Sequence, residues 1–473
     1  MAVRKVIGAW TGLVLLCLLA AAPSLTQARA PIDPRIFEQM GTNPTGEATF
    51  LVVLSARPQL DGLPPAPDRL ARRERTVNLL KATAARSQAP VLHRLTQLHA
   101  QGLVRAFQGF FSTNVVSVTG GQPAVSTLAA LPGVDALEAD TPVQVQGWLV
   151  GGARPADADV GILAVQSNIR QVQAPAAWAL GFRGQGVVVA GIDTGVRHTH
   201  AALVRNYRCG RDGPHRTCWL DAVAGERVPY DDHFHGTHTM GTAVGRLGPG
   251  HRGGQKRQVD RLQGDGRGRE GHAHRHPGVL RLPAGPAGAL HAGYDQQLLG
   301  RSPRQHGLYR PDRCLAGRRD HPGLLGGNAG PACGSTSSPG EYTRAFAAGA
   351  VDREDLIAPF SSRGPASPEN GGSIKPDVVA PGVSIRSATH LCDSCYGLAS
   401  GTSMAAPHVT GVVALVLSKN PTLAPGRQRV IVERSARAIQ DLTCGGRPSD
   451  YNVYGWGRID ALRAVNATPA VLP

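Results

Sequence analysis

Beyond its first 30 residues the sequence has no apolar run long enough to cross a lipid bilayer. The first 30 residues carry Arg4 and Lys5, then an apolar run over 6–22, and end on the small-x-small tripeptide Ala28-Arg29-Ala30. This order is typical of a cleaved secretory signal. An uncleaved membrane anchor is the alternative, and the short apolar run disfavours it. We therefore expect a signal peptide over 1–30, a secreted protein and no membrane partner.

A second cysteine pair at zinc-site spacing is also missing. Seven cysteines follow residue 30, and two of them form a lone C-x-x-C over 392–395. Because structural zinc sites draw on four ligands, one such pair predicts no metal site. Export permits disulfides, and the odd number of cysteines leaves at least one unpaired.

Aromatic residues are scarce where the charge is highest. The formal net charge is +16, and residues 251–322 carry 13 Arg and 1 Lys against 6 Asp or Glu, which is half of the excess. The aromatic residues there are Tyr294 and Tyr309 alone, so the sequence lacks platforms on which bases could stack. We therefore expect no nucleic acid among its partners. Internal repeats and low-complexity tracts are absent too.

Hydrophobic periodicity predicts a small α+β domain over residues 31–150. It indicates a strand over 49–54, helical segments over 70–80 and 92–98 interrupted at Pro90, strands within 104–118, a helix over 123–131 and a strand over 134–145. Residues 151–168 are rich in Gly, Ala and Asp without a period, which predicts a linker.

A larger α/β domain is predicted over residues 169–465. The continuous apolar run 187–192 indicates a strand of a parallel sheet that is covered on both faces. The same alternation returns near the end of the chain, with a strand over 377–380 and a helix from about Ser403 to Leu417.

Three residues of this domain are suited to nucleophilic catalysis. Asp193 follows the buried strand, His235 opens a segment of small residues, and Ser403 stands at a helix start, where the backbone N–H groups and the helix dipole favour an oxyanion. A serine hydroxyl needs a histidine to take its proton, and that histidine needs a carboxylate to orient it. Asn328, in a Gly-rich turn, is the side-chain donor that we expect in the oxyanion hole, beside the backbone N–H of Ser403.

The chain order Asp, His, Ser and the residues around each resemble the subtilisin-like serine protease (subtilase) family. The motifs are Asp-Thr-Gly at 193–195, His-Gly-Thr-His at 235–238 and Ser-Gly-Thr-Ser-Met-Ala-Ala-Pro-His-Val-Thr-Gly at 400–411, with further matches at 361–365, 375–382 and 454–461. The residues before Asp193 look most like the bacillopeptidase F branch. The resemblance covers about 169–250 and 326–464.

This resemblance implies a doubly wound parallel sheet for 169–465 and an inhibitory propeptide for 31–150. We expect the enzyme itself to cut this propeptide off between Gln146 and Ser167, a range that includes most of the linker 151–168. It also implies a monomeric endopeptidase that acts on proteins or peptides through an acyl-enzyme on Ser403, with His235 as general base and Asp193 orienting it. No cofactor is required for that chemistry, although a structural calcium ion is possible. The family forms its substrate pocket partly from the stretch near 335–342. The small polar residues Ser-Thr-Ser-Ser at 335–338 suggest that the floor of this pocket is uncharged and that Ser337 binds substrate.

Each feature also has a structural interpretation. Asp-Thr-Gly can be a turn, His235 a packing residue, Ser403 an N-cap and Asn328 part of a Gly-rich turn. We expect His238 to be structural. Asp231 and Asp232 are candidate calcium ligands, but paired carboxylates on a loop are more often simply solvated.

Residues 251–325 depart from the family. They show neither strand nor helix periodicity, and a loop of this length is unusual inside a compact domain. A disordered insertion and a basic partner-binding loop are two interpretations. We favour a third, in which this segment is family sequence in a shifted reading frame. It predicts that the family's central strands and one cleft wall are lost, so the alternative function is a catalytically dead or misfolded relative.

Overall fold

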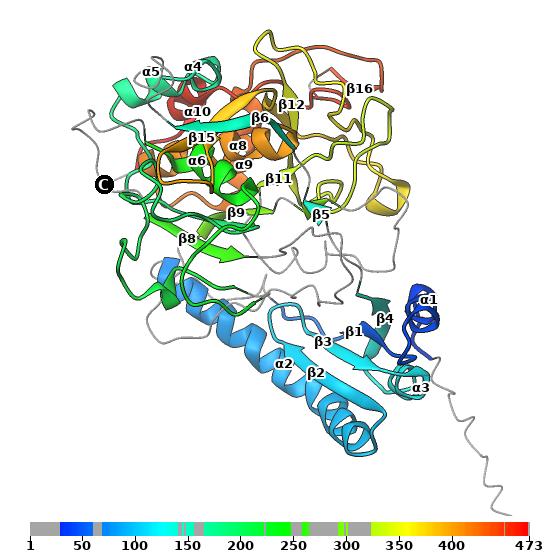
Figure 1. The fold of residues 1–473 in the computed structure, drawn as a ribbon. Helices are drawn as coiled ribbons and strands as arrows, with labels where there is room; N and C mark the ends of the chain where they lie inside the picture. The colour runs from blue at the N-terminus through cyan, green and yellow to red at the C-terminus, as the bar shows by residue number, and fades with distance from the viewer. Residues whose placement is uncertain are drawn as a thin grey trace, which may run out of the picture.

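The computed structural model describes residues 29–59, 69–140, 144–145, 148–155, 165–221, 224–246, 258–263, 292–297, 299–300, 323–448 and 450–471. The predicted signal peptide over 1–30 lies almost wholly outside them. Figure 1 shows two bodies, a small one built from the N-terminal part of the chain and a large one built from the remainder. No helix among the described residues is long and apolar enough to span a membrane.

The small body is an antiparallel sheet with helices packed on it. Strands β1 (Ala48–Leu54), β2 (Val104–Phe110), β3 (Val115–Gly120) and β4 (Val134–Ala139) pair in the order β2-β3-β1-β4. Helices α1 (Arg35–Thr42), α2 (Arg69–Ala100) and α3 (Gln122–Ala129) complete it. Its core joins residues of all these elements, among them Phe50, Leu95 and Leu137. The predicted β-α-β-β-α-β order is confirmed.

Two details differ from the sequence prediction. Helix α2 does not break at Pro90 but is continuous through it, with a total length of 32 residues. Proline removes one helical hydrogen bond, while Val91, Leu95 and Leu98 recur at helical spacing and are buried, so packing outweighs the loss. Helix α1 was not predicted, and strand β4 ends at Ala139 rather than at 145.

A six-stranded parallel sheet forms the centre of the large body. Its order is β13-β12-β11-β9-β7-β8, built from β7 (Val188–Asp193), β8 (Gln258–Gln263), β9 (Ala292–Gln297), β11 (Gly323–Leu325), β12 (Phe346–Val351) and β13 (Val378–Pro381). The order reverses at β7, because its neighbours on the two sides are the two strands that follow it in the chain. Such a reversal opens a crevice at the carboxyl ends of the strands, which is where β7 ends in Asp193.

Helices α6 and α8 pack together against this sheet. Helix α8 (Thr402–Lys419) contacts β11, β12 and β13, and α6 (His235–Val244) contacts both α8 and β7. The strand predicted over 187–192 and the helix predicted from Ser403 to Leu417 are thus confirmed as β7 and α8. Residues 264–291 and 301–322 lie outside the described part of the chain, so coverage of both sheet faces stays a prediction.

The segment 251–325 was expected to lack the family's central strands, and that expectation was wrong for the backbone. Both β8 and β9 fall inside it and pair parallel to β7, and β11 ends it. Neither strand has a period of two in its sequence, since β8 reads Gln-Val-Asp-Arg-Leu-Gln. Pairing with a buried neighbour therefore sets these strands, which sequence periodicity does not indicate.

The remaining elements surround the sheet. They are β5 (Gln144–Val145), β6 (Trp148–Pro155), α4 (Ser167–Gln171), α5 (Ala174–Ala179), a 3₁₀ turn (His215–Thr217), β10 (Leu299–Gly300), a second 3₁₀ turn (Pro368–Asn370), β14 (Ile385–Ala388), β15 (Cys395–Ser400), α9 (Pro425–Ser435), β16 (Gly446–Arg447), β17 (Asp450–Tyr451) and α10 (Ala461–Ala467). Strands β14, β15 and β6 form a separate antiparallel sheet.

Candidate active site

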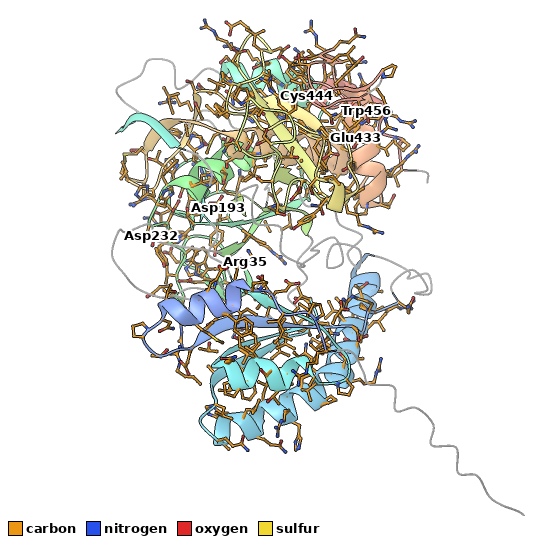
Figure 2. The ribbon with its side chains drawn as sticks, turned by 90° about the vertical axis from the view of Figure 1, so that its right-hand side faces the viewer. Arg35, Asp193, Asp232, Glu433, Cys444 and Trp456 are labelled. Atoms are coloured by element: carbon orange, nitrogen blue, oxygen red, sulfur yellow. A yellow bond between two sulfur atoms is a disulfide. The ribbon has the colours of Figure 1, made fainter. Side chains whose placement is uncertain are left out.

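Asp193 ends β7 in a fully hydrogen-bonded state. Its side chain is buried, Oδ1 accepts from His235 Nδ1 at 2.8 Å and from the Thr194 amide at 2.7 Å, and Oδ2 accepts from the Thr239 hydroxyl at 2.9 Å. A buried carboxylate that accepts bonds on both oxygens is stabilised in its charged form. Figure 2 shows Asp193 and Asp232 at one end of the large body and Glu433, Cys444 and Trp456 at the other.

His235 is the first residue of α6 and is completely buried. Because Asp193 accepts from Nδ1, this nitrogen carries a proton and Nε2 is left as the basic nitrogen of a neutral ring. The Asp193 carboxylate therefore both orients the imidazole and stabilises the imidazolium that would form on protonation.

The start of α6 is held by side chains next to this pair. The carboxylate of Asp231 accepts from the amides of His233, Phe234 and Thr237, at 3.1, 3.1 and 2.8 Å. The Thr194 hydroxyl accepts from the Gly236 amide at 3.0 Å and donates to Asp231 at 2.9 Å. These bonds satisfy amides that a helix start leaves without partners, so the position of His235 is fixed relative to Asp193.

Phe234, directly before His235, has a backbone φ of 132°, a region that non-glycine residues rarely adopt. Such a conformation costs on the order of 1–3 kcal/mol and persists only where the surroundings impose it. Here Phe234 packs with Ile385, Ala399 and Met404 in one buried cluster.

Ser403 lies in the first turn of α8 and is completely buried. The helix is preceded by Gly401 at φ 149°, a conformation that favours glycine. Met404, next to Ser403, and Phe234, next to His235, share the cluster described above, and α6 packs on α8. Residues that are far apart in the sequence thus bring the segment of Ser403 against the segment of His235.

Asn328 is locked to the residue before Ser403. Its Oδ1 accepts from the Thr402 amide at 2.8 Å and from the Thr402 hydroxyl at 3.0 Å. An amide N–H can only donate, so the acceptor end of the Asn328 side chain is identified without ambiguity. Its Nδ2 is buried and has no hydrogen-bond partner among the described residues. Buried donors are nearly always satisfied, so this one is suited to a group that arrives with a ligand.

Ser337 borders the turn that carries Asn328. It is buried, and its hydroxyl lies 3.0 Å from the point where a side chain on Gly327 would begin. Gly327 has φ 105°, and the Ser362 hydroxyl lies closer still to that point, at 2.7 Å, so only glycine fits there. Sequence reasoning missed Glu341 nearby, which is buried and accepts from the Ser338 hydroxyl at 3.0 Å.

The other candidate residues have structural surroundings. His238 is completely buried, donates from Nε2 to the Ile385 carbonyl at 2.9 Å, and burial lowers its pKa to about 4. It is therefore neutral and engaged with the backbone, as a structural histidine would be. Both carboxylate oxygens of Asp231, a predicted calcium ligand, accept hydrogen bonds from protein donors. Among the described residues, no group of three or more His, Cys, Asp or Glu could hold a metal ion. Calcium binding stays a prediction.

Six of the cysteines are paired in the described part of the chain. The pairs are Cys209–Cys218, Cys333–Cys444 and Cys392–Cys395. The C-x-x-C is therefore a disulfide and not a metal site. Cys314, which would be the unpaired seventh, lies outside the described residues.

The chain between the two bodies pairs with two strands of the large body, one of which leads to Ser403. Strand β5 pairs with β10, Val145 opposite Leu299. Strand β6 pairs antiparallel with β15, Trp148 opposite Ser400, three residues before Ser403. The connecting chain thus adds a strand to β10 before residue 146 and another to β15 after residue 147.

Comparison with known proteins gives a consistent result. The sequence profile of the subtilase family matches residues 184–264 and 326–457, which include Asp193, His235, Asn328 and Ser403. Bacillopeptidase F of Bacillus subtilis is 31% identical over 431 residues, 84% of this chain, but the match spans only 29% of that longer protein. M-protease of Shouchella clausii is 31% identical over 349 residues, a match that covers 72% of this chain and 78% of M-protease. Subtilisin BL of Lederbergia lenta is 32% identical over 302 residues, a match that covers 62% of this chain and 96% of subtilisin BL.

Proposed function

The chain belongs to the subtilase family, whose subtilisin-type members are serine endopeptidases, and from this premise we propose that it hydrolyses peptide bonds through an acyl-enzyme on Ser403. The observation that carries the proposal is the unused donor of Asn328, which sits beside the Ser403 segment with its acceptor end already bound to Thr402. A tetrahedral oxyanion is the partner that such a donor lacks.

Each residue has a defined task in this reaction. His235 Nε2 removes the Ser403 proton as Oγ bonds to the scissile carbonyl carbon, and Asp193 stabilises the imidazolium. Asn328 Nδ2 and the backbone N–H of Ser403, at the N-terminus of α8, bind the oxyanion. The C–N bond then breaks, His235 gives its proton to the leaving amine, and water releases the acyl group by the same steps. No cofactor takes part in these steps.

Residues 31–150 are proposed to be an inhibitory propeptide and folding aid, followed by the processing region 151–168. The pairing of β5 with β10 and of β6 with β15 supports this, because a chain that crosses an active site as an added strand binds as substrates do. The relatives are proteases of bacteria, which supports secretion and a protein or peptide substrate. We also propose that the protein is a monomer. A doubly wound sheet fits the order reversal at β7. Ser337 is proposed to line the substrate pocket.

A fluorophosphonate that labels activated serines tests the function. Ser403 should be modified in the parental chain, and Ser403→Ala or His235→Ala should lower kcat by about 10⁶, the scale established for subtilisin. Ser418→Ala, the same change near the other end of α8, is the matched control and should retain activity. Turnover like the parental chain in a clean Ser403→Ala preparation would remove Ser403 as the nucleophile.

A catalytically dead relative is the second candidate, and one finding favours it. The family profile stops at residue 264 and resumes at 326, so a segment that should contribute to the cleft does not match. A folded chain whose Ser403 stays unlabelled, but which still binds a peptide inhibitor, would support this candidate.

A further inference from the structure

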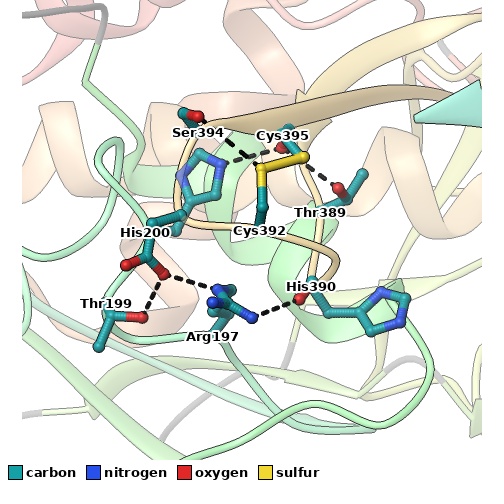
Figure 3. Close-up of a disulfide and its surroundings, with 9 residues drawn as sticks. Arg197, Thr199, His200, Thr389, His390, Cys392, Ser394 and Cys395 are labelled. Carbon is teal, nitrogen blue, oxygen red and sulfur yellow. Dashed lines mark hydrogen bonds and ion pairs between the residues drawn. A yellow bond between two sulfur atoms is a disulfide. The ribbon is translucent and has the colours of Figure 1, made fainter. Parts of the chain in front are cut away.

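The Cys392–Cys395 disulfide closes the tip of the β14–β15 hairpin and holds Asp393 between its two cysteines. Figure 3 shows that this small loop faces the segment 197–200. The segment begins four residues after Asp193, and β15 runs from Cys395 towards Ser403. The loop thus contacts the residues that follow Asp193 in the chain, and it is continuous with the strand that leads to Ser403.

Asp393 binds the segment at three points. Its Oδ1 accepts from Arg197 Nε and from the Thr199 hydroxyl, each at 2.6 Å, and its backbone carbonyl accepts from the Ala201 amide at 2.6 Å. Arg197 also donates from Nη1 to the His390 carbonyl at 2.9 Å. The Thr199 and Arg197 bonds lower the pKa of Asp393, so the carboxylate is charged at neutral pH.

A fifth hydrogen bond comes from His200, which is buried and donates from Nε2 to the Cys395 carbonyl at 2.9 Å. That same carbonyl also accepts from the Thr389 amide. His390, two residues before the disulfide loop, and Cys395, at its end, are therefore both bound to the segment after Asp193.

Arg197 continues this connection to the catalytic pair. Its backbone amide donates to the hydroxyl of Thr237 at 2.9 Å. Thr237 stands two residues after His235 in α6, and its own amide donates to the Asp231 carboxylate. Arg197 therefore links the disulfide loop to the start of α6, since its side chain binds the loop and its backbone amide binds Thr237. This link stands beside the direct bond between α6 and β14, from His238 to the Ile385 carbonyl.

Stability alone does not account for this arrangement. The side chains of Arg197 and Asp393 are 37% and 45% exposed, and ion pairs that are this exposed contribute little to folding. Five hydrogen bonds to residues 197–201 do, however, fix the position of that short segment.

We propose that Asp393, carried in the Cys392–Cys395 loop, is a positioning residue for the pair Asp193–His235 and acts through Arg197. The inference rests on the proposed proteolytic function. Losing the contact would let the segment after Asp193 shift while leaving the substrate-binding surfaces in place, so kcat should fall and KM should not change. Misplacement of a catalytic group by about 1 Å can cost as much as 10²-fold.

The test measures kcat and KM on a peptide substrate for Asp393→Ala, Asp393→Asn, Arg197→Ala and the double variant Arg197→Ala/Asp393→Ala. We expect Asp393→Ala to lower kcat by about tenfold or more with KM within about twofold of the parental value. Asp393→Asn retains an acceptor oxygen, so its kcat should stay close to the parental value. The double variant should be no worse than the poorer single variant, because both remove the same contact. The cysteine pair variant Cys392→Ser/Cys395→Ser should reproduce the kcat loss.

Asp450→Ala is the matched control, since it removes a different partly exposed ion pair, Arg447–Asp450. Parental labelling of Ser403 together with unchanged kcat in Asp393→Ala, or a loss that appears in KM alone, would overturn the inference and leave the proposed function intact. An unlabelled parental Ser403 would overturn both.

Discussion

Thr402 holds Asn328 through two hydrogen bonds, one from its backbone amide and one from its hydroxyl, and both end on Asn328 Oδ1. The arrangement leaves the Nδ2 donor as the only polar group of that side chain without a partner among the described residues. It also binds the Asn328 side chain to the first turn of the helix that carries Ser403, so the nucleophile and the oxyanion donor are held in a fixed relative position.

Replacing Asn328 tests this donor directly. Asn328→Ala should lower kcat by roughly 10²–10³, the scale known for the equivalent change in subtilisin, with little change in KM because the oxyanion exists only in the transition state. Thr402→Val keeps the amide bond and removes the hydroxyl bond, so its effect should be smaller. A loss confined to KM in Asn328→Ala would show that this side chain binds substrate and not the oxyanion.

Two buried histidines should make stability depend on pH. Burial lowers the pKa of His238 and of His408 to about 4 from an ordinary value of 6.5. His408 is neutral in its site, where Nδ1 donates to the Met404 carbonyl and Nε2 accepts from Asn168. Between pH 6.5 and 4 the unfolded chain binds protons that the folded chain does not. Stability is therefore full above pH 6.5 and falls as the pH drops towards 4, by at most about 1.4 kcal/mol per pH unit for each histidine.

His408→Gln removes one of these groups, and urea unfolding followed by tryptophan fluorescence can measure the difference. Above pH 7 the parental chain and the variant should differ by a constant amount. Between pH 6.5 and 4.5 the variant should lose stability less steeply. Parallel curves across the whole range would show that His408 does not contribute to acid sensitivity.

The precursor should be cut close to Trp148. Strand β5 ends at Val145, opposite Leu299, and β6 begins at Trp148, opposite Ser400 and close in the chain to Ser403, so three peptide bonds from Val145 to Trp148 join the two pairings. This narrows the expected processing range of 146–167. N-terminal sequencing of active protein should find a start at Gln146, Gly147 or Trp148, and Ser403→Ala should stay uncut. A mature terminus still at Pro31 would contradict the propeptide assignment, and one beyond Pro155 would contradict the narrower site.

Local signals predicted the elements that carry the triad, but tertiary contacts set their precision. The strand before Asp193 and the helix that contains Ser403 can be predicted from the sequence because burial imposes a pattern on consecutive residues. The bond from Thr402 to Asn328 joins residues 74 positions apart and leaves no periodic trace. Disulfide partners likewise do not follow from the number of cysteines, and so the structure was needed to pair Cys392 with Cys395.

The coding DNA for residues 245–330 should contain two compensating frame shifts, near Gly250 and near Gly326. Residues 294–300 can be encoded TAT GAT CAA CAA CTC CTG GGG, and dropping the first base gives Met-Ile-Asn-Asn-Ser-Trp, which resembles the family's cleft strand. The same shift turns 257–263 into a run with Lys-Trp-Ile-Ala-Cys and 312–321 into one with Ala-Ala-Leu-Arg-Ala-Ala-Gly. The first two stretches coincide with β9 and β8, the strands that flank β7, although their present residues lack a strand period.

If the shift is real, the restored reading supplies apolar strands where the present one supplies residues such as Asp260 and Arg261 beside β7. A domain is held together by only about 5–15 kcal/mol, so this loss of core would leave the present chain poorly folded and weakly active. The frame-restored chain should unfold at higher urea concentration, and its Ser403 should react with fluorophosphonate in full. Resequencing that confirms the present frame, combined with robust proteolysis by the present chain, would refute the hypothesis. The two measurements are independent, because the first reads the DNA and the second reads the folded site.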